Sequence, residues 1–324
     1  MAVTVERRKF QGRGRIDAKG GLYSRGMPVG LLTKGTVIHV DSTHANASDS
    51  NDGKNPDRPM ATIDAAVAKC TADKGDVIIV SAGHAETIAT AAAIDLDIAG
   101  VTLIGLGNGD NKPTITFATL TTTTIKVNAK NVCIQNLRLV CNIDSLVKFI
   151  DVNNHYCTIE DCEFVTSSTK EATSFINLAT TFDYLTVRGC RFEQPTDPTG
   201  VDGDPNTGAL YCVDSEHILF EDCWFDGSFE TAIFHNKTTA CKHLWVNNCY
   251  GIQALSGAEP FQLVAGATGG MIGGSAFITP AEAAATEATL VGTIGDGFFV
   301  LQPGSFGNDG AAGGQGGIII ATAS

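Results

Sequence analysis

Cys157-Thr-Ile-Glu-Asp-Cys-Glu-Phe164 is the stretch that decides the fold, because its pattern returns several times along the chain. Further copies are Val132-Cys-Ile-Gln-Asn-Leu-Arg-Leu139, Leu185-Thr-Val-Arg-Gly-Cys-Arg-Phe192, Ile218-Leu-Phe-Glu-Asp-Cys-Trp-Phe225 and Leu244-Trp-Val-Asn-Asn-Cys-Tyr-Gly251. A fainter copy covers residues 270–277, and an earlier one begins at Val101. The sixth position recurs at steps of 31, 25, 28, 33, 26 and 26 residues. Irregular periods of this size are typical of solenoid coils joined by loops of variable length.

Each copy predicts two short strands separated by a bend. Its first, third, sixth and eighth positions are mostly apolar, and the odd step from three to six interrupts the alternation of a single strand. The fifth position holds residues that tolerate a left-handed backbone, namely Asn136, Asp161, Gly189, Asp222, Asn248 and Gly274. The sixth-position cysteines should stack inward in consecutive coils as buried, reduced thiols; they are Cys162, Cys190, Cys223 and Cys249. A disulfide framework of the ten cysteines is the alternative.

These features predict an all-β right-handed parallel β-helix. Its coils should lie about 4.8 Å apart, the spacing of neighbouring strands. Outward positions of the copies would then form two ladders of alternating charge. One ladder joins Glu160, Arg188 and Glu221, and the other joins Arg138, Glu163 and Arg191. Opposite charges on neighbouring strands are mildly stabilising.

Composition divides the 324 residues into three segments. Residues 1–36 form an extended, glycine-rich arm with a charge of +6, whereas the whole chain carries −13, so the remainder carries −19. Residues 37–303 form the β-helix, whose open end is closed by an amphipathic cap helix over 59–70 with Ile63, Val67 and Cys70 on one face. Residues 304–324 form a glycine-rich end. We expect no signal peptide, no membrane span, and no nucleic-acid binding by the acidic body.

The segment Ala61-Thr-Ile-Asp-Ala-Ala-Val-Ala-Lys-Cys-Thr-Ala-Asp-Lys-Gly-Asp-Val-Ile-Ile-Val-Ser-Ala-Gly83 resembles the opening of pectin-lyase-like β-helix proteins. Those proteins begin with a cap helix, a Gly-Asp turn and a first strand that ends near glycine. The resemblance covers roughly residues 37–83, together with the turn at Asn51-Asp-Gly53 and Pro59. It implies the fold and carries over no catalytic residue.

A second resemblance is to virion proteins of the head region of tailed phages. It is carried by Glu6-Arg-Arg-Lys-Phe-Gln-Gly12 and Lys34-Gly-Thr-Val-Ile-His-Val-Asp41 joined to the β-helix. It implies a head decoration or cement protein that is assembled in the host cytoplasm, resides in the virion, and binds the major capsid protein or another virion protein. A homo-oligomer, trimer or dimer, is expected. The arm is the expected attachment device, through Arg7, Arg8, Lys9, Arg13, Arg15, Lys19 and Arg25.

Enzymatic chemistry is not expected from the residues. A glycosidase needs two carboxylates about 5–9.5 Å apart, and the candidates are Glu160, Glu163, Glu193, Glu221 and Asp226. Arginine neighbours in the ladders would lower the pKa of three of them, which disfavours a general acid. The seven histidines are dispersed, and we expect His217 and His235 to be loop residues in different coils. No catalytic, cofactor-binding or metal-binding residue is therefore predicted.

Three aromatic residues are predicted to form one outward patch, namely Trp224, Trp245 and Tyr250. Tryptophan and tyrosine are enriched at protein interfaces, which favours a partner contact. The alternative is a carbohydrate-binding or carbohydrate-degrading β-helix of the tailspike kind, since aromatic faces also bind sugars. A cluster of unneutralised carboxylates would favour that alternative.

Overall fold

The computed structural model describes residues 23–24, 27–28, 34–91, 93–178, 182–195, 208–229, 231–236, 241–253, 259–263, 270–278 and 298–301. The chain divides into two units, Met1–Lys34 and Gly35–Ser324. In the first unit, β1 (Tyr23–Ser24) pairs with β2 (Met27–Pro28) in antiparallel fashion. The seven basic arm residues predicted to attach a partner, and the glycine-rich segment 304–324, lie outside the described residues.

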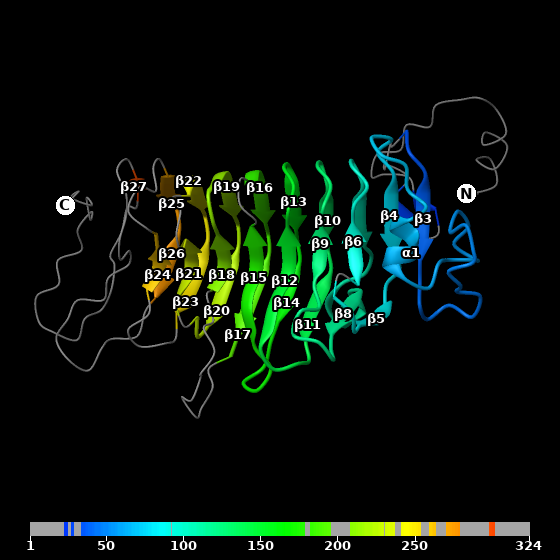
Figure 1. The fold of residues 1–324 in the computed structure, drawn as a ribbon, viewed down its shortest axis with the longest axis horizontal. Helices are drawn as coiled ribbons and strands as arrows, with labels where there is room; N and C mark the ends of the chain where they lie inside the picture. The colour runs from blue at the N-terminus through cyan, green and yellow to red at the C-terminus, as the bar shows by residue number, and fades with distance from the viewer. Residues whose placement is uncertain are drawn as a thin grey trace, which may run out of the picture. The chain divides into compact units, whose positions relative to one another are not determined.

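The second unit is a parallel β-helix, as the repeat predicts (Figure 1). Its described strands form three parallel sheets. The long sheet contains β3 (Val37–Val40), β4 (Val77–Val80), β7 (Thr102–Gly105), β10 (Cys133–Gln135), β13 (Cys157–Glu160), β16 (Phe182–Arg188), β19 (Ser215–Glu221), β22 (Lys242–Asn247), β25 (Gly270–Gly273) and β27 (Phe298–Leu301). Each strand pairs with the strand one coil away, so the sheet runs along the helix axis.

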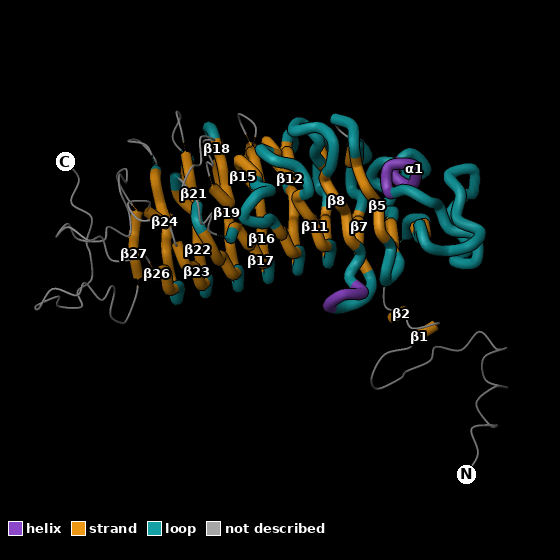
Figure 2. The backbone as a smooth tube through the Cα atoms, turned by 90° about the horizontal axis from the view of Figure 1, so that it is seen from below, coloured by secondary structure: helices purple, strands orange, loops and turns teal. Residues whose placement is uncertain are grey.

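Two further sheets complete each coil (Figure 2). The eight-stranded sheet contains β5 (Ala85–Ile88), β8 (Thr114–Phe117), β11 (Arg138–Cys141), β14 (Glu163–Val165), β17 (Arg191–Gln194), β20 (Trp224–Gly227), β23 (Tyr250–Gln253) and β26 (Ala276–Ile278). The seven-stranded sheet contains β6 (Ile94–Leu96), β9 (Ile125–Val127), β12 (Leu146–Val152), β15 (Ala172–Leu178), β18 (Gly208–Cys212), β21 (Ala232–Asn236) and β24 (Glu259–Gln262). A 3₁₀ turn, η3, spans Gly109–Asn111.

The bend between the long and eight-stranded sheets has the predicted left-handed backbone. The φ values of Asn136, Asp161, Gly189, Asp222, Asn248 and Gly274 are 57°, 53°, 63°, 55°, 51° and 59°. A positive φ reverses the inward and outward alternation at one point, which lets both flanking strands bury their apolar positions. The prediction from the fifth position of the repeat is confirmed.

The core lies between the three sheets and changes character along the axis. Coils near the N-terminus bury aliphatic side chains such as Ile78 and Leu103, whereas later coils bury phenylalanines. The Phe192 ring stacks between Phe164 and Phe225, with centroid distances of 4.7 and 4.8 Å. The sixth-position cysteines are buried and free, and they stack as predicted. Such dense aromatic packing stabilises each coil against its two neighbours.

The helix at the N-terminal end is shorter than predicted. The helix α1 spans Ile63–Val67 rather than 59–70, because Thr62 caps its first turn by accepting from the Ala65 backbone N–H. Ile63 and Val67 are buried as expected, while Cys70 lies beyond the helix and is half-buried. Among the described residues, no helix has the length and apolar character needed to cross a bilayer.

Candidate functional site

A second column of left-handed residues runs along the long sheet, and it is the main feature that the sequence did not reveal. We call it the left-handed column. Its members lie at one position in consecutive coils and have φ values of 72°, 76°, 58°, 60°, 65°, 58° and 55°; they are Gly75, Gly100, Asn131, Tyr156, Tyr184, His217 and His243. The strand registers on either side align them, since Asp183 pairs with Glu216 and Leu185 with Ile218.

The last four members of this column stack their rings. Tyr156 lies 4.8 Å from Tyr184, Tyr184 lies 4.5 Å from His217, and His217 lies 4.7 Å from His243, as ring-centroid distances. The interplanar angles are 6°, 9° and 22°. Bulky residues with positive φ are strained, and stacking offsets part of that cost. Because the faces contact one another, the ring edges are what the stack offers to solvent.

Charged residues flank the column at the start of the strands. Asp183 and Glu216 are register partners on adjacent coils, and Lys242 follows on the next. Lys242 Nζ lies 2.5 Å from Glu216 Oε1. The hydrogen bond and charge of Lys242 hold the pKa of Glu216 below its ordinary value and raise the pKa of Lys242. Glu216 is therefore ionised at neutral pH.

Trp245 lies on the other side of the column, in the middle of the same face. Its Cα register partners are Leu219 and Met271, and 48% of its surface is exposed. Within the described residues, no ring contact joins Trp245 to another aromatic side chain. Its indole is therefore partly open to solvent on this face.

The charge ladder next to Trp245 is confirmed. Arg188 Nε lies 2.8 Å from Glu221 Oε2, and Arg188 Nη1 lies 3.3 Å from Glu160 Oε1. The Asn247 amide extends the row by donating to Glu221. The face thus combines one tryptophan ring with the charged and amide side chains of neighbouring coils.

The second predicted charge ladder is wrong in one of its two contacts. Arg138 lies 3.9 Å from Glu163, but Arg191 pairs within its own strand, with its Nε 2.6 Å from Glu193 Oε1. A partner two residues away on the same face of a strand competes with one on the neighbouring strand. Lys112 takes the place expected of Arg191, with its Nζ 2.9 Å from Glu163 Oε1.

The structure divides the predicted aromatic patch. Trp224 and Tyr250 are neighbours in the eight-stranded sheet, with ring centroids 4.3 Å apart. Trp245 lies in the long sheet instead. The bend at Asn248 separates the two sheets, which the linear spacing of the residues does not show.

One expectation about the histidines is also wrong. His217 and His235 are strand residues, in β19 and β21, rather than loop residues. Carboxylate pairs do occur at adjacent outward positions, since Glu193 is the register partner of Asp226 and Asp183 that of Glu216. The second pair was missed because β16 and β19 begin before the repeated eight-residue segment.

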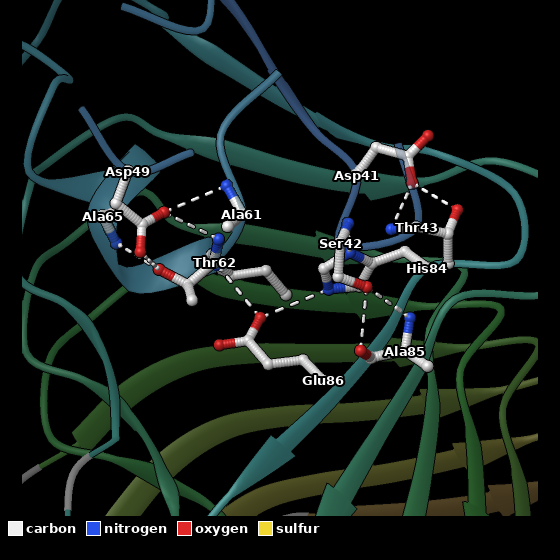
Figure 3. A network of polar contacts seen from close by, with 11 residues as sticks. Asp41, Ser42, Thr43, Asp49, Ala61, Thr62, Ala65, His84, Ala85 and Glu86 are labelled. Atoms are coloured by element: carbon white, nitrogen blue, oxygen red, sulfur yellow. Dashed lines mark hydrogen bonds and ion pairs between the residues drawn. The ribbon is translucent and has the colours of Figure 1, made fainter. Parts of the chain in front are cut away.

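A polar network near α1 contains Ser42, His84 and Glu86, three residue types that form catalytic triads elsewhere (Figure 3). Here His84 Nδ1 accepts from the Ser42 backbone N–H at 2.9 Å, while Ser42 Oγ donates to the Ala85 carbonyl. His84 Nε2 therefore carries the proton and faces Glu86 Oε2 at 3.3 Å. The serine hydroxyl has no base beside it, so the network closes the end of the β-helix rather than activating a nucleophile.

Asp49 anchors the other side of this cap network. Its Oδ1 accepts from the backbone N–H groups of Ala61 and Thr62, both at 3.0 Å. Glu86 Oε2 accepts from the Ile63 backbone N–H at 3.0 Å, which satisfies another free donor of α1. These bonds tie the loop after β3 and the helix to strand β5.

Comparisons with known proteins found structures of similar fold but no similar sequence. No family model and no curated protein matches the sequence. Solved structures with a similar fold include the three that follow. They are a rhamnogalacturonan lyase (12% identity, 74% of this chain and 73% of that one, TM-score 0.49), pectate lyase Pel9A (12%, 73% and 67%, TM-score 0.43), and the GH136 lacto-N-biosidase from Eubacterium ramulus (11%, 82% and 58%, TM-score 0.42).

The three names correct one expectation. All three proteins are named as enzymes, which contradicts the expectation of a chain without enzymatic activity. No phage protein is among these three, so a virion role remains a proposal. The architecture of this chain, a parallel β-helix, follows from its own strand pairing.

Proposed function

We propose that the chain is a carbohydrate-active β-helix that binds an extended glycan along the outward face of the long sheet. The observation that carries this proposal is the exposed Trp245, which lies on the same outward face as Arg188, Glu221 and Asn247. The C–H groups of a sugar pack against the negative face of an indole. A polymer running along the axis would cross one coil about every 4.8 Å.

The net charge of the β-helix favours a neutral glycan over an acidic one. Residues 37–324 carry a net charge of −19, so a polyuronide would be repelled by the body as a whole. A neutral glycan loses nothing to this repulsion and can hydrogen-bond to Arg188, Glu221 and Asn247. We therefore assign the face to neutral oligosaccharides.

Tryptophan fluorescence tests this proposal directly, because the chain has two tryptophans of similar exposure, 48% at Trp245 and 42% at Trp224. In the Trp224→Phe variant, a neutral oligosaccharide should change the emission of Trp245. In the Trp245→Phe variant, the remaining Trp224, stacked on Tyr250, should not respond. An equal response in both variants, or none in either across a panel of neutral and uronate oligosaccharides, would refute binding at this face.

Asp183 and Glu216 supply the candidate groups for cleavage of a bound glycan. Their strands are adjacent, so their Cα atoms are about 4.8 Å apart, within reach of the two-carboxylate arrangement of glycosidases. Glu216 stays ionised beside Lys242, which suits a base or nucleophile, and Asp183 supplies the second carboxyl group of the pair. The variants Asp183→Asn and Glu216→Gln should abolish product formation while the fluorescence response persists. Full turnover by either variant would exclude the pair.

Attachment to a virion is the second candidate function, and the arm favours it. Residues 1–34 form a unit apart from the β-helix, and the +6 charge of residues 1–36 contrasts with the acidic body. We propose that this arm binds an acidic surface of a capsid or other virion protein, with the chain as a homo-oligomer. Deletion of residues 2–34 should leave a folded β-helix that no longer joins particles. Incorporation of the truncated chain at full occupancy would place the attachment elsewhere.

A further inference from the structure

Three side chains with metal-binding atoms converge at the end of the left-handed column. Glu216, His217 and His243 each offer one ligand atom, and these atoms all lie within 4.8 Å of one another. Glu216 and His217 belong to β19, and His243 belongs to the adjacent β22. Two coils of the solenoid therefore hold the group, and register fixes its members relative to one another.

The two imidazoles have unused nitrogen atoms. Nδ1 of His217 and Nδ1 of His243 are both shielded from solvent, and neither has a hydrogen-bond partner. A shielded polar atom without a partner costs free energy that a ligand can recover. No existing hydrogen bond has to break before either nitrogen binds a cation.

Glu216 completes the set with a negative charge. Only its Oε1 is engaged by Lys242, so the second carboxylate oxygen remains for another ligand. Lys242 nevertheless competes with any cation for this carboxylate, because both interact with the same charge. Lys242 should thus weaken the affinity of the site for a cation, while the Glu216 carboxylate remains available as a ligand.

We propose that Glu216, His217 and His243 bind a divalent transition-metal ion of the zinc class. Two imidazole nitrogens and one carboxylate oxygen match zinc rather than calcium or magnesium, which prefer all-oxygen sites. Bonds of about 2.0–2.1 Å place tetrahedral ligand atoms roughly 3.3 Å apart. The ligand atoms, which lie within 4.8 Å of one another, must therefore close by up to about 1.5 Å, and the two stacked rings must tilt toward one point.

This site does not depend on glycan binding, since its ligands are tested without any sugar. Titration calorimetry of the full chain with Zn²⁺ alone should show one ion bound per chain. The informative variants are His217→Tyr and His243→Tyr. Tyrosine already occupies this column at Tyr156 and Tyr184, so the ring stack and the left-handed backbone are retained while the ligand nitrogen is lost.

Each tyrosine variant should bind Zn²⁺ at least about tenfold more weakly, because one of three protein ligands is gone. His155→Ala is the matched control; this histidine lies on the same face, next to Asp183, outside the cluster. The affinity of the His155→Ala variant for Zn²⁺ should equal that of the native chain. Lys242→Met should bind more tightly, since it removes the competitor for Glu216.

Co²⁺ distinguishes this site from the free thiols. Binding at the proposed site gives visible d–d bands without thiolate-to-cobalt charge transfer, whereas binding at half-buried Cys70 or Cys133 gives a strong near-ultraviolet band. The proposal is overturned if the His217→Tyr/His243→Tyr double variant binds Zn²⁺ as the native chain does. It is equally overturned if the native chain binds no Zn²⁺ or shows the thiolate band alone.

Discussion

The early coils, from β3 to β10, and the late coils, from β13 to β22, share one backbone but differ in what they place on it. The left-handed column has nearly the same φ throughout, yet it holds Gly75, Gly100 and Asn131 in the early coils and tyrosines and histidines in the late ones. The core changes along the same axis, from aliphatic side chains to phenylalanines and cysteines.

This difference distinguishes the residue types that the backbone conformation favours from those that it does not. Glycine and asparagine adopt a positive φ at little cost, so the early members show the residue types that the backbone itself prefers. The late members are strained there. Their rings stack along the candidate glycan-binding face, and the two histidines are part of the candidate metal site. The late coils are therefore where the function of the molecule should be sought.

The largest effect is expected in the late core. Phe192→Ala should lower the free energy of unfolding by about 3–5 kcal/mol, because the ring is fully buried between Phe164 and Phe225. Leu103→Ala in the early core should cost about 2–5 kcal/mol. Hydrogen exchange should locate each loss in the neighbouring coils alone, since solenoid coils contact only their neighbours. A uniform loss of protection from β3 to β25 would show that the two regions unfold as one.

The column itself can be tested by exchanging residue types. Tyr184→Ala should cost about 1–3 kcal/mol, since two stacked contacts are lost while the strain remains. Tyr184→Gly should cost about 1 kcal/mol less, because glycine relieves the positive φ. Denaturant unfolding measures both. If the glycine variant is the less stable of the two, backbone strain does not distinguish the late column from the early one.

The matched change in the early coils is Gly100→Ala. The nearest atom to an added Cβ there would be Asp73 Cα at 3.5 Å, an ordinary contact. The φ of 76° is then the main penalty, about 1–2 kcal/mol by denaturant unfolding. A neutral result would mean that this position tolerates side chains as freely as the late coils do.

Acid should affect the early coils through His39. Burial lowers the pKa of this histidine below the ordinary 6.5, so the unfolded chain binds a proton that the folded chain does not. Stability is therefore retained above pH 6.5 and lost as pH falls from 6.5 to the lower folded pKa. Hydrogen exchange in β3 should show this loss in the native chain and in a His44→Gln control, but not in His39→Gln. An unchanged acid response in the His39 variant would assign it to another group.

The smallest effect is expected from the charge ladder of the late coils. Arg188→Gln removes both ion pairs, with Glu160 and Glu221, but the side chain is about half exposed and screened by water. The change in the thermal midpoint should be small at low salt and absent at 1 M salt, where the screening length is about 3 Å. A large change that survives high salt would indicate a packing role for the arginine stem.

Much of this architecture could be predicted from the sequence. The odd step between the third and sixth repeat positions requires a reversal of the strand face, and Asn136 or Gly189 at that point supplies the backbone for it. The Glu160, Arg188 and Glu221 ladder followed from register alone. Local sequence patterns predict the structure where each residue type is one that commonly adopts the backbone conformation found there.

The candidate site could not be predicted in the same way. Tyr184 and His217 do not signal a left-handed backbone, and only their alignment with Gly75 and Gly100 across coils reveals it. The meeting of His217 with His243 depends on loop lengths that set which coils are adjacent. Likewise, Arg191 forms its ion pair with Glu193 on its own strand, and this pairing depends on side-chain geometry rather than on strand register.

The cap network of Asp49, Thr62, His84 and Glu86 has a consequence for synthesis of the chain. It is complete once Glu86 has left the ribosome, before the coils that follow it in the chain exist. Each later coil pairs with the one made before it, so the solenoid can be wound in the order of translation. Because the cap covers the N-terminal end of the β-helix, only the strand edges of the most recently formed coil are free to pair. Coils can therefore be added in one direction only, from the N-terminal end onward.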